Sequence, residues 1–595
     1  MQPWTIIPST GSEPADEWIR LGVQAHTENR LDAAESNYRQ ALRLDPRSVI
    51  ATQNLAVALA GRGNLNEALL TAERAALMDG QTTLVHANRA LICLEADRID
   101  EGLEAAEKAV QVAEQSGRIE FPDGTVQALF AKALISATAG RPQDAIDAYE
   151  EMLQREPLHP AAGPNRSFIQ TLVDSTPEQL LSTRKQYATT HRPPVLPIRS
   201  HPNDRSPDRT LRVGYVGGDF KTHSAAMIFG NVLLHHDPKQ VEHYIYSSLP
   251  VNAEQDDLTK RFFASVSSPI VQGAGPRTGS NDGTVLVSTN RWRDIVSLND
   301  EQAAELIRQD RIDILVDLAA HTSGGRLGIF FRRPAPVQCT AWGFAHGTGL
   351  EEVDYFLADP VAVPVEERRY YAEKVVDLPC VVSYLPPPYN VRGTSAAPYS
   401  SRDHFTFGSY ARYEKLSDEC LRAFAEILRQ VPDSRLQFKD HAFRRPYAIR
   451  RVLSFMDGIA QERLLFSIST NHGDHLLAYQ QCDLCLDPWP HGGGAVFLEQ
   501  MYMGVPSLTL RGKQPSGRTG ASVLTAMGRS EWVADTPEEF VNKAVALASG
   551  GVGTKLLINA RKTLRAEFLL SPVVAGYAAA VEAAYRTMWK EWCQR

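Results

Sequence analysis

Cysteine is scarce in this chain: seven thiols, an odd number, are scattered over 595 residues. A disulfide framework needs an even set in a short secreted domain, so we expect free thiols and a reducing compartment. Cys482 and Cys485 form a CxxC motif. Because no second CxxC and no histidine pair follow at zinc-finger spacing, and the pair flanks an apolar stretch, we interpret them as buried core thiols.

Long apolar runs are also lacking. No stretch of 18 apolar residues occurs in the sequence, so no membrane span is expected. The first 18 residues have neither the basic start nor the apolar stretch of a signal peptide. These features together predict a cytoplasmic protein.

A surplus of positive charge is absent as well, since the formal net charge is −8. A protein that binds nucleic acid irrespective of sequence needs a basic face, so we expect no nucleic-acid partner. Hydrophobic residues make up 43% and charged residues 22%, the balance of a soluble globular protein. At 595 residues the chain is too long for one core, which predicts two to four domains.

Three nucleotide and metal motifs are missing too. The strict GxGxxG of dinucleotide enzymes does not follow the apolar run that ends at Val216, and no Walker A sequence is present. No DxD-type pair lies at a predicted strand end, because Asp256 and Asp257 belong to a polar, helical stretch. We therefore expect no metal and no cofactor.

What the chain does contain begins with a repeat of 34 residues, typical of a tetratricopeptide (TPR) array. Small residues at Gly22 and Ala34 would let two antiparallel helices approach, with Tyr38 filling the space between them. Ala68 lies one period after Ala34, and Gly102 a further period on. The first copy is marked by Trp18, Leu21, Gly22, Ala25, Ala34, Tyr38, Ala41 and Pro46.

About four such repeats fit within residues 13–165, enough for a stable short α-solenoid. TPR arrays commonly bind peptides or partner proteins in their concave groove, and a purely structural or dimerising role is the alternative. Residues 166–209 form a linker, with a helix predicted over 172–189 followed by a proline-rich segment.

Residues 210–395 read as an α/β domain. Strands are predicted at 211–216, 241–248 and 312–318, with a helix at 301–310. Such alternation indicates a doubly wound parallel sheet, in which ligands bind at the carboxyl ends of the strands. Three polar side chains follow predicted strand ends: Asp219, His223 and His321. Asp219 and His321 are assigned to the acceptor or sugar side, and His223 is a candidate catalytic residue.

A second Rossmann-like domain spans 396–570, and a C-terminal helix within 571–595 could pack back across the first domain. The central stretch of this domain, 483–522, reads as strand, glycine-rich loop, helix, strand, loop and helix. Gly492, Gly493 and Gly494 let the backbone approach a ligand closely. The helix expected to start near Ala495 offers free N–H groups to an anion, and Glu499 lies on its first turns.

Two Rossmann-like domains with such a loop predict a GT-B glycosyltransferase. From Leu211 onward the chain resembles the TPR-linked protein O-GlcNAc transferases and their bacterial relatives, including SPINDLY-type protein O-fucosyltransferases. The stretches that carry this resemblance are LRVGYVGGDFKTHS, ILVDLAAHTSGGR, RRPAPVQCTAWGFAHGTG, SYARYEKLSDE, VPDSRLQFK, CDLCLDPWPHGGGAVFLEQMYMGVPSLTL and SGRTGAS.

The resemblance implies roles for single residues. His223 matches a histidine that faces the donor, as a base or only as a group that binds the sugar, and Lys415 matches a lysine on the donor pyrophosphate. Glu499 stands where the family has an acidic residue on the ribose. His475 and Arg518 match positions on the nucleotide side, and Gly493 and Gly494 match the phosphate-binding turn.

Some positions depart from the family pattern. Relatives carry threonines after the glycine turn, where this chain has Ala495, Val496 and Phe497. Gly492, after His491, replaces an asparagine; Arg412 replaces an amide side chain; and His472 stands in place of a lysine. The donor is therefore expected to be UDP-GlcNAc or another nucleotide sugar, such as GDP-fucose, a UDP-hexose or a CMP-linked nonulosonic acid.

The expected reaction is direct displacement at the anomeric carbon by a Ser or Thr hydroxyl, with inversion and without a metal. Lys415, helix N–H groups and Arg518 would stabilise the departing phosphate. The expected acceptor is a protein held by the TPR groove, with flagellin as one candidate. The alternatives are a non-catalytic TPR adaptor with a degenerate transferase domain, or a transferase that acts on a glycan or small molecule.

Overall fold

The computed structural model describes residues 14–116, 124–250, 256–267, 291–391, 396–468 and 470–595. It divides into two compact units. One unit contains the residues up to 173 together with 442–454, and the other contains 174–441 and 455–595. The first is helical, whereas the second holds two parallel sheets.

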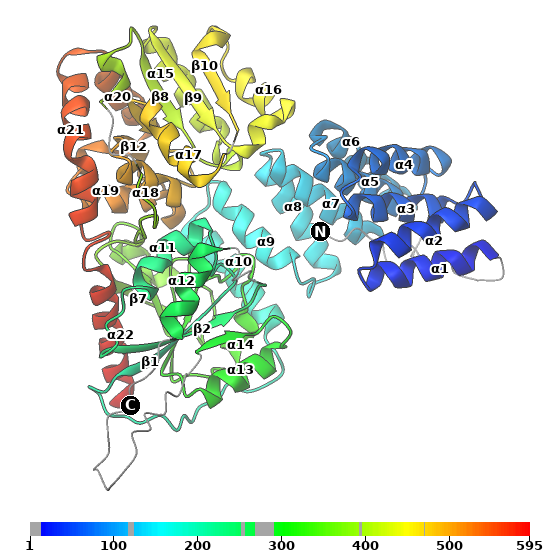
Figure 1. Cartoon of the computed structure of the whole chain (residues 1–595), viewed down its shortest axis with the longest axis horizontal. Coiled ribbons are helices and arrows are strands. Elements are labelled where there is room, and N and C mark those ends of the chain that lie inside the picture. The colour runs from blue at the N-terminus through cyan, green and yellow to red at the C-terminus, as the bar shows by residue number, and fades with distance from the viewer. Residues whose placement is uncertain (1–13, 117–123, 251–255, 268–290, 392–395, 469) are drawn as a thin grey trace, which may run out of the picture. The chain divides into compact units, whose positions relative to one another are not determined.

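The helices up to residue 155 form consecutive antiparallel pairs, the expected TPR solenoid (Figure 1). A further helix, α9, follows the fourth pair. The helices are α1 (Pro14–Thr27), α2 (Leu31–Leu44), α3 (Val49–Gly61), α4 (Leu65–Met78), α5 (Thr83–Glu95), α6 (Ile99–Ser116), α7 (Gly124–Thr138), α8 (Pro142–Arg155) and α9 (Ala162–Ile169).

Small residues hold the helices of this solenoid close together, as the repeat pattern predicts. A Cβ atom at Gly22 would lie 2.4 Å from the ring of Tyr38, and one at Gly102 would lie 2.1 Å from Cδ1 of Ile135. Tyr38 and Ala34 are completely buried. The tyrosine therefore fills the space that the glycine leaves, and a larger residue at Gly22 would force the pair apart.

The first unit also includes α16 (Pro446–Ser454), which is distant from the repeats in sequence. Tyr447 packs against the apolar core of the later repeats. Arg445 donates from Nε to Oδ1 of Asp97 at 2.6 Å, and Arg444 pairs with the same carboxylate. Apolar packing and ion pairs thus both join α16 to the solenoid.

The first sheet of the second unit has seven parallel strands in the order β3-β2-β1-β4-β5-β6-β7. The order reverses direction between β1 and β4, which makes their carboxyl ends the switch point where ligands bind in such sheets. The strands are β1 (Leu211–Gly217), β2 (Val241–Ser247), β3 (Trp292–Asp294), β4 (Ile314–Asp317), β5 (Val337–Thr340), β6 (Tyr355–Ala358) and β7 (Lys374–Asp377).

The second sheet has six parallel strands in the order β10-β9-β8-β11-β12-β13. Its switch point lies between β8 and β11, where the sequence places the glycine loop. The strands are β8 (Phe405–Ser409), β9 (Ser434–Lys439), β10 (Leu464–Ser467), β11 (Leu484–Leu486), β12 (Ser507–Leu510) and β13 (Val533–Ala534). The predicted strands of both sheets are confirmed.

Helices precede, connect and follow these strands, and the connecting ones provide the crossovers that parallel pairing requires. They are α10 (Pro177–His191), α11 (Ser224–Leu233), α12 (Asp257–Val266), α13 (Asp300–Gln309), α14 (Leu327–Phe331), α15 (Asp418–Gln430), α17 (His472–Ala478), α18 (Ala495–Tyr502), α19 (Thr519–Ala526), α20 (Pro537–Ala548), α21 (Gly551–Leu570) and α22 (Tyr577–Cys593). The helix expected from residue 172 begins later, at Pro177, because Thr176 and Gln179 form a capping box there.

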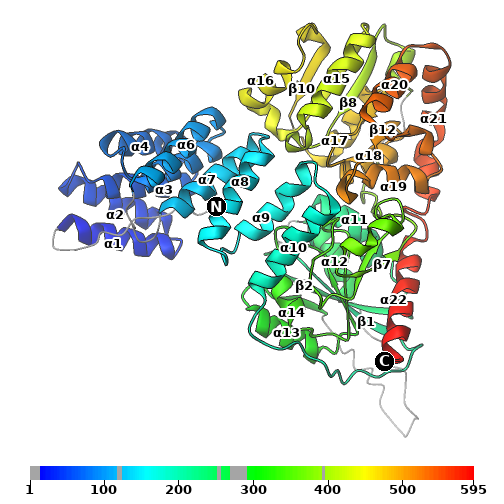
Figure 2. The same ribbon diagram turned by 180° about the vertical axis from the view of Figure 1, so that it is seen from behind.

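The C-terminal helix α22 packs back on the first sheet, as predicted, and runs beside it in the view from behind (Figure 2). Tyr585 and Tyr215 of β1 are hydrogen-bonded through their hydroxyls at 3.1 Å. Glu582 pairs with His236 at 2.9 Å. The end of the chain is thereby tied to the sheet that carries one half of the candidate site.

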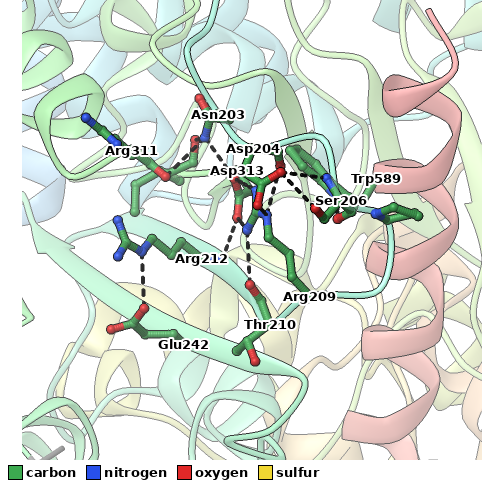
Figure 3. A network of polar contacts seen from close by, with 12 residues as sticks. Asn203, Asp204, Ser206, Arg209, Thr210, Arg212, Glu242, Arg311, Asp313 and Trp589 are labelled. Atoms are coloured by element: carbon green, nitrogen blue, oxygen red, sulfur yellow. Dashed lines mark hydrogen bonds and ion pairs between the residues drawn. The ribbon is translucent and has the colours of Figure 1, made fainter. Parts of the chain in front are cut away.

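A polar network fastens the linker to the amino-terminal edge of the same sheet (Figure 3). Asp313 is 1% exposed and accepts two hydrogen bonds from Arg209, both at 2.6 Å. It also accepts from the side chain of Asn203 and the backbone of Arg212. The Arg209 guanidinium lies 4.7 Å from the ring of Trp589 in α22. One buried carboxylate thus joins the linker to the sheet, and its arginine partner stacks on the C-terminal helix.

Candidate functional site

Lys415 and the glycine loop meet at the switch point of the second sheet. Lys415 ends a short 3-10 helix that follows β8, and Gly492 lies in the loop that follows the adjacent strand β11. Nζ of Lys415 donates a hydrogen bond to the backbone oxygen of Gly492 at 2.6 Å. The sequence predicts this side chain and this loop separately, and the fold brings them into contact.

Burial disfavours the protonated form of Lys415. Burial and, to a smaller extent, Arg412 lower its pKa to about 7, although the Asp487 carboxylate acts in the opposite direction. A lysine in this state gains a strong partner when an anion approaches, because a phosphate would favour its protonated form. Arg412 directly follows the turn after β8 and adds positive potential at the same edge.

The Asp487 carboxylate holds the glycine loop through a hydrogen bond. It accepts from the backbone N–H of Gly493 at 2.6 Å and from the Thr509 hydroxyl at 2.8 Å. Burial raises its pKa to about 6, against the opposing effects of these bonds and of Lys415. The sequence does not single out Asp487, because four residues separate it from Gly492 and only the folded loop brings its carboxylate under the glycines.

Space around the loop explains its glycines. A Cβ atom at Gly493 would lie 2.8 Å from Oδ1 of Asp487, and one at Gly492 would lie 3.0 Å from Oδ2. Gly494 is the residue before α18, and its backbone oxygen accepts from the N–H of Phe497 at 3.0 Å. The N–H groups of Ala495 and Val496 have no acceptor within the helix. The backbone therefore turns tightly over Asp487 and presents the start of α18 beside Lys415.

Glu499 is held ionised by two histidines. It is 4% exposed, and it accepts from Nε2 of His472 at 3.0 Å and from the Tyr479 hydroxyl at 3.0 Å. Nε2 of His475 lies 3.3 Å from the same carboxylate. Burial alone would raise the pKa of Glu499, but the histidines outweigh it and lower the pKa to about 2. The structure thus joins three of the predicted residues in one cluster.

Arg518 has its donors occupied. Its five N–H groups reach both oxygens of Glu367 at 2.7 Å and the backbone oxygens of Ala362, Gly512 and Lys513. The sequence-based expectation placed this guanidinium on the departing phosphate. In the structure it instead fixes the loop after β12 to the segment after β6, because a carboxylate 151 residues away in sequence occupies it.

His491 precedes the glycines and is half-buried. Burial lowers its pKa well below the usual value, with Lys415, Arg412 and His346 acting in the same direction. It is therefore a neutral group.

His223 and Asp219 lie after β1, at the switch point of the first sheet. Nδ1 of His223 accepts from the backbone N–H of Ala225 at 3.3 Å and lies 3.4 Å from Asp219. A neutral His223 with this hydrogen bond carries its proton on Nε2 and can donate it to an oxygen. Its side chain is 46% exposed, so the ring is accessible.

His321 follows β4 but is buried, with 2% of its surface exposed. Its Nε2 donates to the backbone oxygen of Thr348 at 2.8 Å, and burial lowers its pKa to about 4. The sequence predicts that His321 lies on the sugar side of the site. In the structure His321 is buried and holds the segment between β5 and β6. That segment carries His346, a buried histidine that sequence reasoning quoted within a motif but did not single out.

Within the described residues, no three His, Cys, Asp or Glu side chains gather in a way that could hold a metal ion. Among the helices of those residues, none combines the length and apolar character needed to cross a membrane.

Comparisons with known proteins agree with this geometry. The sequence profile of glycosyltransferase family 41 matches residues 280–383 and 388–571. The profile of tetratricopeptide repeats matches residues 25–82 and 88–161. The first profile covers the second sheet and strands β3 to β7 of the first sheet, whereas β1 and β2 lie before it. The second profile covers most of the solenoid.

Relatives with curated names include SPINDLY proteins of plants. The chain is 34% identical over 399 residues to that of Arabidopsis thaliana, covering 66% of this chain and 41% of the relative. It is 32% identical over 456 residues to that of Oryza sativa subsp. japonica, covering 75% and 46%. Both are named probable UDP-N-acetylglucosamine–peptide N-acetylglucosaminyltransferases. The matches thus span less than half the length of these relatives.

A solved structure matches over nearly the whole chain. A variant of the O-GlcNAc transferase of Thermobaculum terrenum superposes with a TM-score of 0.74 at 26% identity, covering 98% of each chain. Tetratricopeptide repeats followed by two parallel sheets, each with a reversal of strand order, are the architecture of a TPR-linked glycosyltransferase of the GT-B type. The chain therefore carries a glycosyltransferase family 41 domain after its tetratricopeptide repeats.

Proposed function

We propose that the chain transfers a sugar from a nucleotide sugar to Ser or Thr hydroxyls of a protein acceptor. The observation that carries this proposal is the 2.6 Å contact between Lys415 and the Gly492 carbonyl, at the switch point of the second sheet. A buried cation beside a glycine turn and a helix N-terminus suits a diphosphate. The names of the relatives support the same reaction.

The chemistry requires that the bond between the anomeric carbon and the phosphate oxygen break as the acceptor oxygen attacks from the opposite face. The configuration inverts, and the nucleoside diphosphate leaves with the bonding electrons. Lys415 and the first N–H groups of α18 would stabilise its charge, without a metal ion in the proposed mechanism. The proton of the acceptor hydroxyl would pass to the departing phosphate, directly or through water, and Nε2–H of His223 would bind an oxygen of the sugar or acceptor.

The donor is best sought among several nucleotide sugars. Ala495 and Val496 supply backbone N–H groups at the start of α18, and neither they nor Phe497 supply a hydroxyl. This cradle suits any diphosphate, so UDP-GlcNAc, a UDP-hexose and GDP-fucose are all candidates. A CMP-linked nonulosonic acid, with its single phosphate, is the fourth.

The acceptor would be a protein docked by the TPR solenoid, since such arrays bind peptides in their grooves. Flagellin is one candidate acceptor. The alternative function, a non-catalytic adaptor, would keep the solenoid contacts but have no use for a buried lysine beside the glycine turn. A transferase that acts on a glycan or small molecule is the third alternative.

The test is a donor panel followed by mass analysis. Full-length protein is melted with UDP-GlcNAc, a UDP-hexose, GDP-fucose and a CMP-nonulosonic acid, and the expected result is that one of them raises Tm. Proteins co-expressed with the chain should then gain the mass of that sugar on Ser or Thr. If no donor changes Tm and no protein gains mass, the adaptor function is the better account.

A further inference from the structure

His346 is a buried side chain whose hydrogen-bonding capacity is unused. It is 1% exposed, and neither ring nitrogen has a hydrogen-bond partner within the described residues. Its ring packs against Phe344, with the centroids 5.3 Å apart. Buried polar groups are nearly always paired, so a histidine with two free nitrogens needs an explanation.

Hydrogen bonds and close packing fix the segment that carries His346, so disorder of this segment does not explain why the ring nitrogens have no partners. The backbone N–H of Thr348 donates to Glu373 at 2.6 Å, and its hydroxyl donates to the same oxygen at 2.5 Å. His321 holds the backbone oxygen of Thr348 from the other side. Gly349 packs on α10, where an added Cβ would lie 2.6 Å from Cβ of Arg184. The imidazole is therefore presented by a loop that is fixed on three sides.

His346 lies on the segment that follows β5, at the carboxyl-terminal edge of the first sheet, where ligands bind in such sheets. It is one of the groups that lower the pKa of His491, which precedes the glycine loop. Burial lowers the pKa of His346 itself well below the usual value, and Arg184 and Arg518 act in the same direction. The ring is thus neutral, and it comes from the first sheet toward the loop of the second.

A second buried group near the loop is also unpaired. Ser516 is 3% exposed, and its hydroxyl has no partner within the described part of the chain. Its backbone oxygen accepts from the N–H of Gly492 at 3.0 Å. One unpaired side chain from each sheet therefore lies around the His491–Gly492 segment.

A neutral imidazole has one N–H donor and one bare acceptor nitrogen. To satisfy both, a ligand must accept one hydrogen bond and donate another. A diphosphate can only accept, because its oxygens carry no protons near neutral pH. Sugar hydroxyls and an acetamido group can do both, and a sugar ring presents them side by side.

We propose that His346 binds the transferred sugar of the nucleotide-sugar donor, with one ring nitrogen donating to and the other accepting from its polar substituents. This inference rests on the proposed function and adds a sugar-recognition residue to it. His346 then distinguishes a nucleotide sugar from the free nucleotide, whereas Lys415 and the glycine loop bind the diphosphate common to both. Donors whose sugar lacks a correctly placed hydroxyl or amide would lose this contact.

The test measures how much the sugar contributes to binding. Titration calorimetry on the full-length chain compares UDP-GlcNAc with UDP, and GDP-fucose with GDP, for wild type and for His346→Leu and His346→Asn. Leucine removes both hydrogen-bonding atoms at similar volume, while asparagine keeps one donor and one acceptor. His26→Leu is the matched control, because His26 is also a buried histidine with an unpaired Nδ1 among the described residues but lies in the solenoid.

The expected result is that His346→Leu weakens binding of the nucleotide sugar by about tenfold or more, as the loss of two hydrogen bonds predicts, while the affinity for the free nucleotide is unchanged. His346→Asn should recover part of the loss, and His26→Leu should behave as wild type. Without ligand, His346→Leu should melt at or above the Tm of wild type, because no internal hydrogen bond is removed.

Three results would contradict the inference. An equal loss for nucleotide and nucleotide sugar, or no loss for either, would show that His346 does not bind the sugar. A lower Tm of ligand-free His346→Leu would show that the ring serves the fold. If wild type binds nucleotides but gains nothing from the sugar, this inference fails alone; if wild type binds no nucleotide or nucleotide sugar, the proposed function fails with it.

Discussion

Replacing Lys415 with methionine keeps the length of the side chain and removes its charge. The pKa of about 7, compared with 10.5 for a free lysine, means that burial penalises the protonated form. This shift corresponds to about 5 kcal/mol at pH values well below 7. Because the unfolded chain binds the proton more tightly, this group makes the free energy of unfolding rise as pH increases from about 7 to 10.5.

The variant should therefore be more stable than wild type when no ligand is bound. At pH 6 we expect Lys415→Met to gain a few kcal/mol, less the value of the hydrogen bond to Gly492, which is about 1 kcal/mol. At pH 10 the gain should vanish. Urea unfolding at the two pH values measures the difference.

Catalysis should change in the opposite direction. If Lys415 stabilises the leaving diphosphate, its removal should lower kcat by about 10²- to 10³-fold, the usual cost of losing one group that stabilises a developing anion. In wild type, kcat/KM should fall as pH rises through about 7, because the unliganded enzyme then loses the lysine proton. The assay is release of the nucleoside diphosphate during transfer from the donor that raises Tm.

The reasoning would be refuted by a variant that retains more than a tenth of the wild-type kcat. It would also be refuted if the variant were less stable than wild type at pH 6, since that would mean that the charge supports the fold rather than the reaction.

Three further substitutions test neighbouring parts of the account. Glu499→Gln should lower the free energy of unfolding at pH 7 by about 3 kcal/mol, because the wild-type carboxylate has a pKa of about 2. The stability that this carboxylate contributes is present above pH 4.5 and disappears as the pH falls toward 2. Urea titrations between pH 3 and 7 should show this pH dependence in wild type and not in the variant. Gly493→Ala should weaken donor binding about tenfold or more by calorimetry, since its Cβ would lie 2.8 Å from Asp487; unchanged affinity would mean that the turn does not hold the donor. Asp313→Asn should lower the free energy of unfolding by about 3–5 kcal/mol, because it leaves the Arg209 charge without its buried partner. The kcat of the folded enzyme should stay at the wild-type level. A lower kcat for the fully folded variant would contradict the assignment of this network to the fold.

Local patterns in the sequence were sufficient to predict most of the fold. The 34-residue recurrence of small residues predicts helix pairs because Gly22 must accommodate the ring of Tyr38. The apolar run from Leu211 becomes a central parallel strand because its side chains are buried on both faces. The start of α10 was misplaced because apolar residues around Leu172 extend the helical pattern, whereas the capping box at Thr176 decides where the helix begins.

The site was predictable in part. Glycines after a strand and a lysine after the neighbouring strand could be recognised as separate motifs, and parallel topology brings them together. The partner of Arg518 could not be predicted, because Glu367 lies 151 residues earlier and no local pattern links them. His346 could not be predicted for a related reason. What distinguishes it is that both ring nitrogens lack a hydrogen-bond partner among the described residues, and only the packed structure shows this.

The central claim, transfer of a sugar to protein hydroxyls, is tested most directly by intact-mass analysis of proteins incubated with the full-length chain and the donor that raises its Tm. The account predicts that an acceptor gains the mass of one or more glycosyl residues on Ser or Thr with wild type, and gains nothing with Lys415→Met. Acceptor masses that stay unchanged with wild type for every donor that binds, or that increase equally with Lys415→Met, would contradict it.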